Sequence, residues 1–324
     1  MVSAIIPIYK VEKYIEKCAI SLFEQTLKDI EYIFVDDCSP DDSIQVLRNV
    51  IKKYPERQKQ IRIVSNERNK GLPAARNTGL DYSTGEYVFH CDSDDYVEKD
   101  MLEQMYNTAK VKDADIVWSD WFLSFDKNER YMKQPKYETA DEALKGILIG
   151  TMKYNVWNKL VKKSLYNENN IKFPSGHGMG EDMIMIRLFA CAKRVAYIPK
   201  AFYHYVRLNE NAFTKITSEK HLQDILYNTN KTVNFLLRRN GNALNKEIIC
   251  FKLNVKLPFL ICDNWSVYKI WRSLFPETNA YIMRIKYIPF KSRILQYAAY
   301  KNQFWLVWLY YKIIYKFVYG VIYK

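Results

Sequence analysis

Short runs of apolar residues alternate with longer amphipathic stretches over the first third of the chain. The strand-like runs cover residues 2–6, 32–35, 61–64, 87–89 and 116–118, and apolar residues recur at helical spacing in 14–22, 44–54, 73–82 and 101–109. Continuous apolar runs separated by helices are typical of parallel strands covered on both faces. The pattern therefore predicts an α/β fold with a mostly parallel sheet flanked by helices.

The pattern changes twice in the remainder of the chain. Residues 154–207 are irregular and polar around 172–181, before a helical stretch at 182–191 and short apolar runs at 195–198 and 202–206. From residue 217 onward, apolar residues again recur at helical spacing. We expect a boundary near residue 215, between an α/β domain of residues 1–215 and a helical C-terminal region of residues 216–324.

Polar residues follow each of the first four predicted strands. They are Tyr9, then Asp36-Asp37, then Asn66 with Asn69, and finally Asp92-Ser93-Asp94-Asp95. Ligands of open parallel sheets bind beyond the carboxyl ends of the strands. We therefore expect all four sets of residues to line one edge of the sheet.

The cluster Asp92-Ser93-Asp94-Asp95 predicts a divalent-metal site. Three carboxylates within four residues repel one another unless a cation is present, and Mg²⁺ or Mn²⁺ prefers carboxylate oxygens. Asp94 and Asp92 are the candidate ligands, because their spacing after a strand puts both on one side. The alternative is an acidic loop that caps the following helix. A phosphatase with paired aspartates is disfavoured, because its pair normally follows the first strand.

Two further segments add candidate ligand contacts. Asp36-Asp37, with Ser39, can accept hydrogen bonds from a base or a ribose, or can cap the next helix. In the segment from Asn69 to Gly79, a glycine turn at Gly71 precedes a helix that begins with proline and carries Arg76. Arg76 is placed to reach a phosphate, although such an arginine is commonly a solvated helix residue.

Together these motifs resemble the family 2 glycosyltransferases of the GT-A fold. The motifs, in order, are Pro7-Ile8-Tyr9, Val35-Asp36-Asp37-x-Ser39, Asn69-x-Gly71-x3-Ala75-Arg76-Asn77-x-Gly79 and Asp92-Ser93-Asp94-Asp95. The resemblance covers residues 1–210 and is of the inverting, bacterial surface-polysaccharide type. It implies a GT-A type, Rossmann-like catalytic domain with a nucleotide-binding half over residues 1–110 and an acceptor half over 111–215.

The resemblance also implies an activity and roles for the motif residues. The activity is inverting, metal-dependent transfer from a nucleoside-diphosphate sugar, usually a UDP-sugar. Asp92 and Asp94 would face the ribose and the metal, Mn²⁺ or Mg²⁺, and Asp95 would support them or share the sugar contact. The other implied nucleotide-sugar contacts are Pro7, Tyr9, Asp36, Asp37, Ser39, Asn69, Gly71, Arg76 and Ser93.

An inverting transfer needs a base that accepts the proton of the acceptor hydroxyl, and a carboxylate can serve. Glu181-Asp182 opens a predicted helix after a glycine-rich loop, where acidic residues also simply cap. The resemblance favours Asp182 as the base, with Glu181 shaping the acceptor pocket. Trp157 either stacks on a sugar or fills the core. The remaining expected pocket residues, near the sugar or the diphosphate, are Asn158, Lys159, His177, His204 and Arg207.

The cysteine content and the start of the sequence indicate the cellular compartment and the kinds of site that are disfavoured. The six cysteines are scattered without a C-x-x-C pair, which argues against a zinc site or a disulfide framework and for a reducing compartment. The start of the sequence has no signal-peptide pattern, so we expect a cytoplasmic enzyme.

The formal net charge of +13 is concentrated at the C-terminal end, where residues 284–324 contain eight Lys or Arg and no Asp or Glu. Fourteen aromatic residues lie between 281 and 323, and the apolar stretch 304–311 is too short to span a bilayer. Lys301, Lys312 and Lys316 fall on one side of a helix drawn through this tail. We expect the tail to bind an anionic membrane surface at the inner face of the cell membrane. The alternatives are a helix packed on the catalytic domain and a nucleic-acid-binding arm, of which the second is disfavoured by the dense aliphatic residues.

The leading hypothesis is therefore a nucleotide-sugar-dependent hexosyltransferase that acts on a glycan or lipid-linked acceptor in surface-polysaccharide biosynthesis. A sugar-nucleotide nucleotidyltransferase is the second enzymatic hypothesis, but its Gly-rich, Arg-Lys loop after the first strand is absent. The third hypothesis is a catalytically inactive membrane or nucleic-acid binding module. It is disfavoured because such a module would not need to retain a cluster of mutually repelling aspartates.

Overall fold

The computed structural model describes residues 1–207 and 219–314. The chain packs as two compact units, one formed by Met1–Leu144 with Lys153–Thr232 and the other by Lys145–Met152 with Val233–Lys324. Two of the three boundaries fall within helices α5 (Ala140–Ile149) and α8 (Glu219–Asn240), and the third follows the end of α5. The boundary predicted near residue 215 lies outside the described residues, so the division into a catalytic domain and a C-terminal region stays a prediction.

A nine-stranded sheet forms the centre of the first unit, with strand order β3-β2-β1-β4-β8-β6-β9-β5 and β7 beside β6. The strands are β1 (Val2–Ile8), β2 (Ile30–Asp36), β3 (Ile61–Ser65), β4 (Tyr87–His90), β5 (Tyr96–Val97), β6 (Ile116–Ser124), β7 (Glu129–Met132), β8 (Lys159–Lys162) and β9 (Val195–Val206).

The predicted α/β class with a helical C-terminal region is confirmed, and the two halves of the sheet differ in strand direction. Strands β3, β2, β1 and β4 are parallel, and every residue of β1 is buried. Beyond them, β8 runs antiparallel to both β4 and β6, whereas β9 is parallel to β6. The two short runs predicted at 195–198 and 202–206 form one strand, β9, whose pairing with β6 shifts register in the middle.

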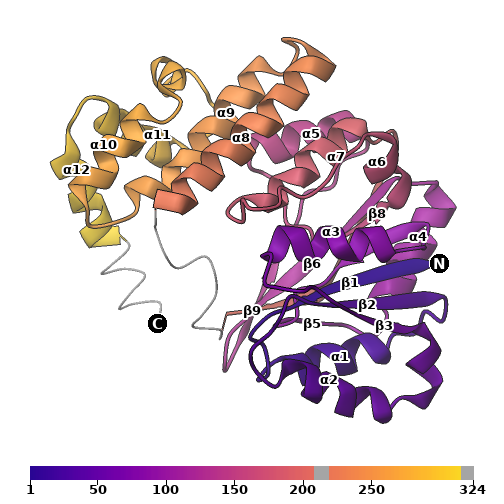
Figure 1. The fold of residues 1–324 in the computed structure, drawn as a ribbon. Helices are drawn as coiled ribbons and strands as arrows, with labels where there is room; N and C mark the ends of the chain where they lie inside the picture. The colour runs from indigo at the N-terminus through magenta and orange to yellow at the C-terminus, as the bar shows by residue number, and fades with distance from the viewer. Residues whose placement is uncertain (208–218, 315–324) are drawn as a thin grey trace. The chain divides into compact units, whose positions relative to one another are not determined.

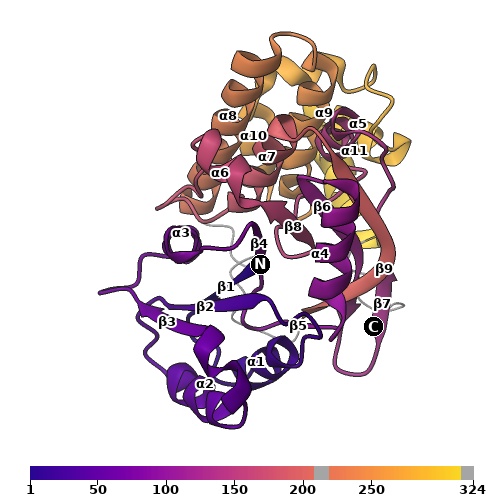
Figure 2. The same ribbon diagram turned by 90° about the vertical axis from the view of Figure 1, so that its right-hand side faces the viewer.

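Helices cover both faces of the parallel half. Figure 1 shows α1 (Ile15–Phe23) and α2 (Ser43–Lys52) on one side of these strands and α3 (Leu72–Tyr82) on the other. Figure 2, turned by 90°, shows α4 (Met101–Lys112), which packs on β6 and β9. Helix α3 approaches β1 so closely that a Cβ atom at Gly79 would lie 2.2 Å from Cγ2 of Ile5. Glycine at this position therefore sets the depth at which α3 lies on the sheet.

Several shorter elements complete the first unit. They are η1 (Pro55–Gln60) before β3, α6 (Lys163–Glu168) after β8, and the 3₁₀ turn η2 (Glu181–Met183), which leads into α7 (Ile184–Cys191). The helix predicted at 182–191 thus begins with one tighter turn, and the acidic pair Glu181-Asp182 lies in that turn.

The second unit is helical. After α8 come α9 (Asn245–Lys256), η4 (Leu257–Leu260), α10 (Trp265–Ser273), η5 (Pro276–Tyr281), α11 (Phe290–Tyr300) and α12 (Phe304–Tyr310). Its core contains the cation of Lys256, which donates to Leu274 O at 2.8 Å and to Asn279 Oδ1 at 2.5 Å and lies 4.3 Å from the ring centroid of Trp271. Across the described residues, no helix is both long enough and apolar enough to cross a membrane.

Candidate active site

The acidic loop after β4 is held in place by a tyrosine of β9. The hydroxyl of Tyr203 donates to Asp95 Oδ2 at 2.7 Å and accepts a hydrogen bond from the backbone N–H of Asp92 at 3.1 Å. Val206 N donates to the other Asp95 oxygen at 2.7 Å, and Asp95 is 1% exposed. Both oxygens of Asp95 are therefore used within the protein, whereas Asp92 and Asp94 are partly exposed.

The electrostatics of this loop suit a divalent cation. Burial raises the pKa of Asp95 well above its usual range, and the neighbouring charges of Asp94 and Asp92 raise it further. Excess negative charge is thus concentrated in this loop, and the metal site itself stays a prediction. Among the described residues, no three His, Cys, Asp or Glu side chains converge as a metal site. An ion held by Asp92 and Asp94 would therefore take its remaining oxygen ligands from water or from a bound ligand.

Arg76 of α3 joins this loop to the acidic pair of η2. Its guanidinium is 1% exposed and donates to Asp92 Oδ1 at 2.7 Å, to Asp182 Oδ1 at 3.0 Å and to Glu181 Oε1 at 3.3 Å. Burial alone would lower the pKa of Arg76, but the three carboxylates outweigh it and raise the pKa. We expected Arg76 to reach a phosphate, and the structure instead gives both terminal nitrogens carboxylate partners. Arg76 thus brings together two predicted sites that are about ninety residues apart in sequence.

The two carboxylates of η2 share this charged environment. Burial raises the pKa of Glu181 to about 8, and the charge of Asp182 adds to the shift while Arg76 opposes it. Burial likewise raises the pKa of Asp182, against the opposing charge of Arg76. Their side chains are still 15% and 23% exposed, so both can be reached from outside. A carboxylate with a raised pKa is a stronger base once it is ionised, which suits proton abstraction near neutral pH.

Helix α8 holds the loop that carries this pair. Asn228 Nδ2 donates to His177 O at 3.1 Å and to Met179 O at 2.9 Å, and the buried carboxylate of Asp224 contacts His177 Nδ1 at 3.1 Å. The His177 ring also stacks on Tyr227, with centroids 3.7 Å apart. On the other side, Asn77 of α3 accepts from Phe173 N and donates to Phe173 O. The loop is therefore fixed by α3 and α8, and His177 serves as one of its anchors.

The predicted nucleotide end of the sheet is organised by Asp37. Its carboxylate is buried and accepts hydrogen bonds from Asn66 Nδ2, Lys70 N and Gly71 N at 2.8–2.9 Å. Gly71 has φ +84°, a conformation that L side chains rarely adopt, so glycine is required where the loop turns into α3. Asp37 therefore fixes the backbone of the loop at this edge of the sheet. The Asn69 side chain contributes by accepting a hydrogen bond from the same Gly71 N.

Asp36 and Tyr9 remain accessible beside it. Asp36 Oδ1 accepts from Ser39 N at 2.9 Å, while the Ser39 hydroxyl accepts from Lys10 N at 2.8 Å. Tyr9 is exposed two residues after the buried Pro7, just beyond the end of β1 at Ile8. The four strand ends thus lie at one edge, where Tyr9 and Asp36, like the partly exposed Asp92 and Asp94, can still meet a ligand.

Comparison with known proteins identifies the family. The model of "Glycosyl transferase family 2" matches residues 3–190. The chain belongs to this family. The resemblance inferred from the motifs is thereby confirmed, and the protein is a glycosyltransferase.

Two curated relatives and one solved structure agree with this assignment. The uncharacterized glycosyltransferase EpsJ of Bacillus subtilis is 32% identical over 236 residues, which cover 69% of this chain and 67% of EpsJ. The cholesterol galactosyltransferase of Borreliella burgdorferi is 32% identical over 292 residues, or 82% of this chain and 77% of that enzyme. The structure of S. aureus TarS residues 1–349 in complex with UDP-GlcNAc aligns with a TM-score of 0.72 at 19% identity, over 96% of this chain and 91% of TarS, and so shares its fold.

The residues expected near the acceptor of this glycosyltransferase are mostly interior. Asn158 and Lys159 are buried, and Lys159 Nζ donates to Lys153 O, Asn155 O and Asn158 Oδ1 at 2.7–2.9 Å. Burial lowers the pKa of Lys159 to about 7. Trp157 is also buried and stacks on Tyr203 and Tyr205, with centroids 4.5 and 5.4 Å apart. Of the two alternatives for Trp157, the structure supports the core position, behind the acidic loop.

His204 lies between the rings of Tyr96 and Phe122, with centroids 4.2 and 4.7 Å away. Its two ring nitrogens contact Glu98 and Glu129 at 2.8 and 2.7 Å. The ring is therefore fully engaged by the protein, so we no longer assign it a contact with the diphosphate. Arg207, at the end of β9, is exposed, and its predicted contact stays a prediction.

Three supporting residues escaped the sequence analysis, namely Tyr203, Asp224 and Asn228. Asp224 and Asn228 are four residues apart in a helix that was predicted, and two polar residues on one helix face could have signalled a buried contact. Tyr203 carries no such signal, because its partners are about one hundred residues away in sequence.

Proposed function

We propose that this glycosyltransferase transfers a sugar, with inversion, from a nucleoside-diphosphate sugar to a hydroxyl group of a glycan or lipid-linked acceptor in surface-polysaccharide biosynthesis. The donor would be a UDP-sugar. The observation that carries the proposal is the Arg76 bridge between Asp92 and Asp182. It brings a candidate donor-side carboxylate and a candidate base into one charged cluster. The similarity to TarS, which was solved with UDP-GlcNAc, supports the choice of donor.

In the proposed reaction, the acceptor hydroxyl attacks the anomeric carbon from the side opposite the diphosphate, and Asp182 accepts its proton. Arg76 orients Asp182 and opposes the rise of its pKa that burial causes, which favours the ionised carboxylate. Glu181, whose pKa is raised to about 8, is largely protonated at neutral pH and can donate a hydrogen bond to the acceptor. Tyr9 and Asp36 bind the nucleoside, and Asp37 and Gly71 shape the edge of the sheet on which it rests.

The carboxylates of Asp92 and Asp94 would hold Mg²⁺ or Mn²⁺, which would supply neutralisation of the charge on the departing diphosphate. The excess negative charge described above fits such an ion.

A donor panel tests the activity. Hydrolysis of UDP-sugars should release UDP with Mn²⁺ and not after chelation, and NMR of a transferred product should show an inverted anomeric centre. If no donor were bound or cleaved with either metal, the proposal would be wrong.

The base is tested with Asp182→Asn. This variant should lower the transfer rate at least about a hundredfold while donor affinity is unchanged, because the base acts on the acceptor. Glu181→Gln is the matched control and should retain most of the rate, since it preserves a neutral hydrogen-bonding side chain. Equal loss of transfer and donor binding in Asp182→Asn would move the base elsewhere.

We also propose that the enzyme works in the cytoplasm as a peripheral protein at the inner face of the membrane. Phe304 and Val307 of α12 are buried, with Phe304 beside Trp265 and Tyr268 of α10, so α12 packs within the second unit. The opposite side of α12 presents an exposed apolar face, formed by Trp305, Leu306 and Leu309. Aromatic residues of this kind suit the headgroup region. Lys316, which was predicted on the basic side of this tail, lies outside the described residues.

A further inference from the structure

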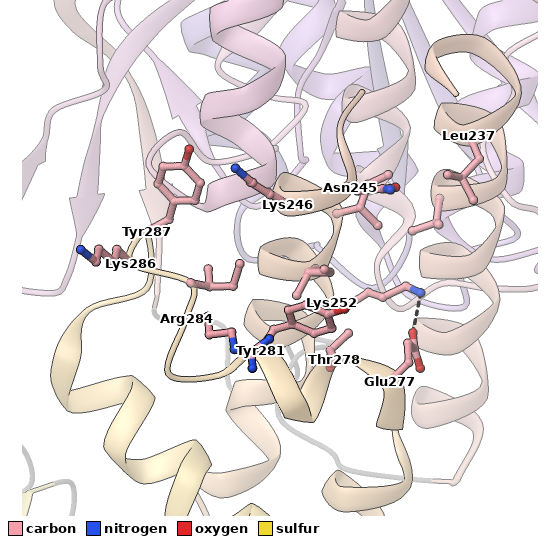
Figure 3. Close-up of a pocket in the computed structure, with 14 residues that line it drawn as sticks. Leu237, Asn245, Lys246, Lys252, Glu277, Thr278, Tyr281, Arg284, Lys286 and Tyr287 are labelled. Atoms are coloured by element: carbon pink, nitrogen blue, oxygen red, sulfur yellow. Dashed lines mark hydrogen bonds and ion pairs between the residues drawn. The ribbon is translucent and has the colours of Figure 1, made fainter. Parts of the chain in front are cut away.

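A groove of about 800 Å³ lies within the second unit, between α8, α9, η5 and residues 284–287 (Figure 3). Apolar side chains supply much of its lining, namely Val233, Leu237, Ile248, Ile249 and Ile285. Two exposed tyrosines, Tyr281 and Tyr287, stand at its edge. A lining of this kind suits a hydrocarbon segment better than a fully polar ligand.

Four cations border the groove against a single acid. They are Lys246, Lys252, Arg284 and Lys286, and the acid is Glu277. Lys252 Nζ pairs with Glu277 at 2.7 Å, as the dashed line in Figure 3 shows. Lys246, Arg284 and Lys286 are exposed, and within the described parts of the chain no carboxylate lies within ion-pair distance of them. The groove therefore carries a net positive charge, and three of its four cations have no carboxylate partner among the described residues.

An exposed apolar stripe follows the groove closely along the chain. Helix α11 starts three residues after Tyr287, and Phe290, Ile294 and Tyr297 are exposed on one of its faces. Their spacing of four and three residues places them in a row. Phe290 is 59% exposed, although a large apolar side chain normally gains from burial.

We propose that this groove binds the phosphate-bearing head group of an anionic membrane lipid. The phosphate would lie among Lys246, Arg284 and Lys286, and the first part of the acyl chain would contact Leu237 and Ile249. Charge complementarity selects an anion, and the apolar lining selects a lipid over a free phosphate. The inference rests on the proposed membrane association and goes beyond it, because it gives the second unit a specific ligand.

Flotation of the full chain with vesicles tests the proposal. The vesicles contain phosphatidylcholine alone or phosphatidylcholine mixed with phosphatidylglycerol, and no donor or metal is added. The wild type should bind the anionic vesicles preferentially. Arg284→Gln combined with Lys286→Gln should weaken that partitioning about thirtyfold, since each cation near an anionic surface contributes a roughly equal share of the binding free energy. The matched control, Lys269→Gln with Arg272→Gln on α10, removes the same charge outside the groove and should leave partitioning close to wild type.

A second pair of variants separates the groove from general electrostatics. Leu237 and Asn234 are both exposed positions of α8, but only Leu237 lines the groove. Leu237→Glu should lower partitioning much more than Asn234→Glu, although both add one negative charge. Thermal unfolding should show that each variant is folded. Equal effects of the two substitutions, or of the two double variants, would overturn the proposal.

Two further results would also overturn it. One is equal binding of the wild type to neutral and anionic vesicles. The other is full displacement from anionic vesicles by inorganic phosphate at constant ionic strength, which would make the groove a site for free phosphate. Because neither donor nor metal is present, failure here leaves the proposed transferase reaction untouched, and failure of the donor panel leaves the groove untouched.

Discussion

Replacement of Arg76 tests the arrangement on which the proposed reaction depends. Arg76→Met keeps the volume of the side chain but leaves Asp92, Glu181 and Asp182 without their shared cation. In the wild type, the guanidinium nitrogens of Arg76 lie 2.7 Å from Asp92 Oδ1 and 3.0 Å from Asp182 Oδ1. At an effective dielectric constant of about 20, each contact corresponds to an attraction of about 6 kcal/mol, which desolvation opposes. Removal of one partner from a buried ion pair typically costs about 3–5 kcal/mol.

We therefore expect Arg76→Met to lower the free energy of unfolding by about 3–5 kcal/mol. The turnover number should fall about a hundredfold or more, because the base is no longer held within reach of its substrate. The pKa of Asp182 should rise further once the opposing charge is gone, so the acid limb of the pH–rate profile should move to higher pH. Arg76→Lys retains the charge and should keep that limb closer to the wild type, while losing the bidentate geometry.

The assay combines thermal unfolding with kcat and KM for the donor over a range of pH. Arg187→Met is the matched control. Arg187 is also a buried arginine of the first unit, but the hydrogen bond seen for its guanidinium goes to a backbone carbonyl, Lys172 O, at 3.3 Å. The control should leave the pH–rate profile unchanged. The reasoning would be refuted by a folded Arg76→Met enzyme whose kcat and acid limb match the wild type.

Three further predictions concern the same unit. Burial holds the pKa of Glu181 at about 8, above its unfolded value, so this group stabilises the folded protein at acid pH and loses that contribution as pH rises from the unfolded pKa through 8. Glu181→Gln should therefore flatten the dependence of the unfolding free energy on pH across this window, as measured by denaturation at several pH values. Asn228→Ala should loosen the loop that carries Asp182 and lower kcat with little change in donor KM, and it should cost about 1–3 kcal/mol, whereas Asn234→Ala on the exposed side of α8 should do neither. Gly79→Ala should cost about 1–3 kcal/mol in thermal unfolding, because its Cβ would overlap a methyl group of β1, and a truncated β1 side chain should recover part of that loss.

The parallel half of the fold could be predicted because its signals are local. Strands β1 to β4 read as continuous apolar runs, since both faces of a parallel sheet are covered, and helices α1 to α4 show helical spacing. The other half gives weaker signals. Strand β7 is largely exposed and β5 has only two residues, so neither carries an apolar pattern. Strand β8 contains lysines at both ends, and one of them, Lys159, is buried. A buried lysine looks like a surface residue in any sequence pattern, because what stabilises it are backbone carbonyls that the pattern does not contain.

The same distinction applies to the candidate site. The strand ends could be placed at one edge of the sheet from topology alone, and Asp92, Asp94 and Asp182 were recognised as residue types that suit the chemistry. What each side chain does depends on partners far away in sequence. The sequence suggests a nucleotide contact for Asp37, but its carboxylate already accepts hydrogen bonds from three donors of the protein. The sequence likewise suggests a phosphate ligand in Arg76, whereas the structure pairs it with carboxylates.

The position of Arg76 changes how the site should be understood. Because one buried cation is shared by Asp92, the proposed donor-side carboxylate, and by Glu181 and Asp182, the proposed acceptor-side pair, the charge states of the two sides are coupled. When a cation binds near Asp92, it takes over part of the charge compensation that Arg76 provides for that carboxylate. The attraction between Arg76 and Asp182 then becomes relatively more important. Asp182 is then held more firmly in its ionised form, which is the form that can accept a proton. A separate arginine for each carboxylate would not link them in this way, so the shared cation offers a physical route by which donor binding can prepare the base.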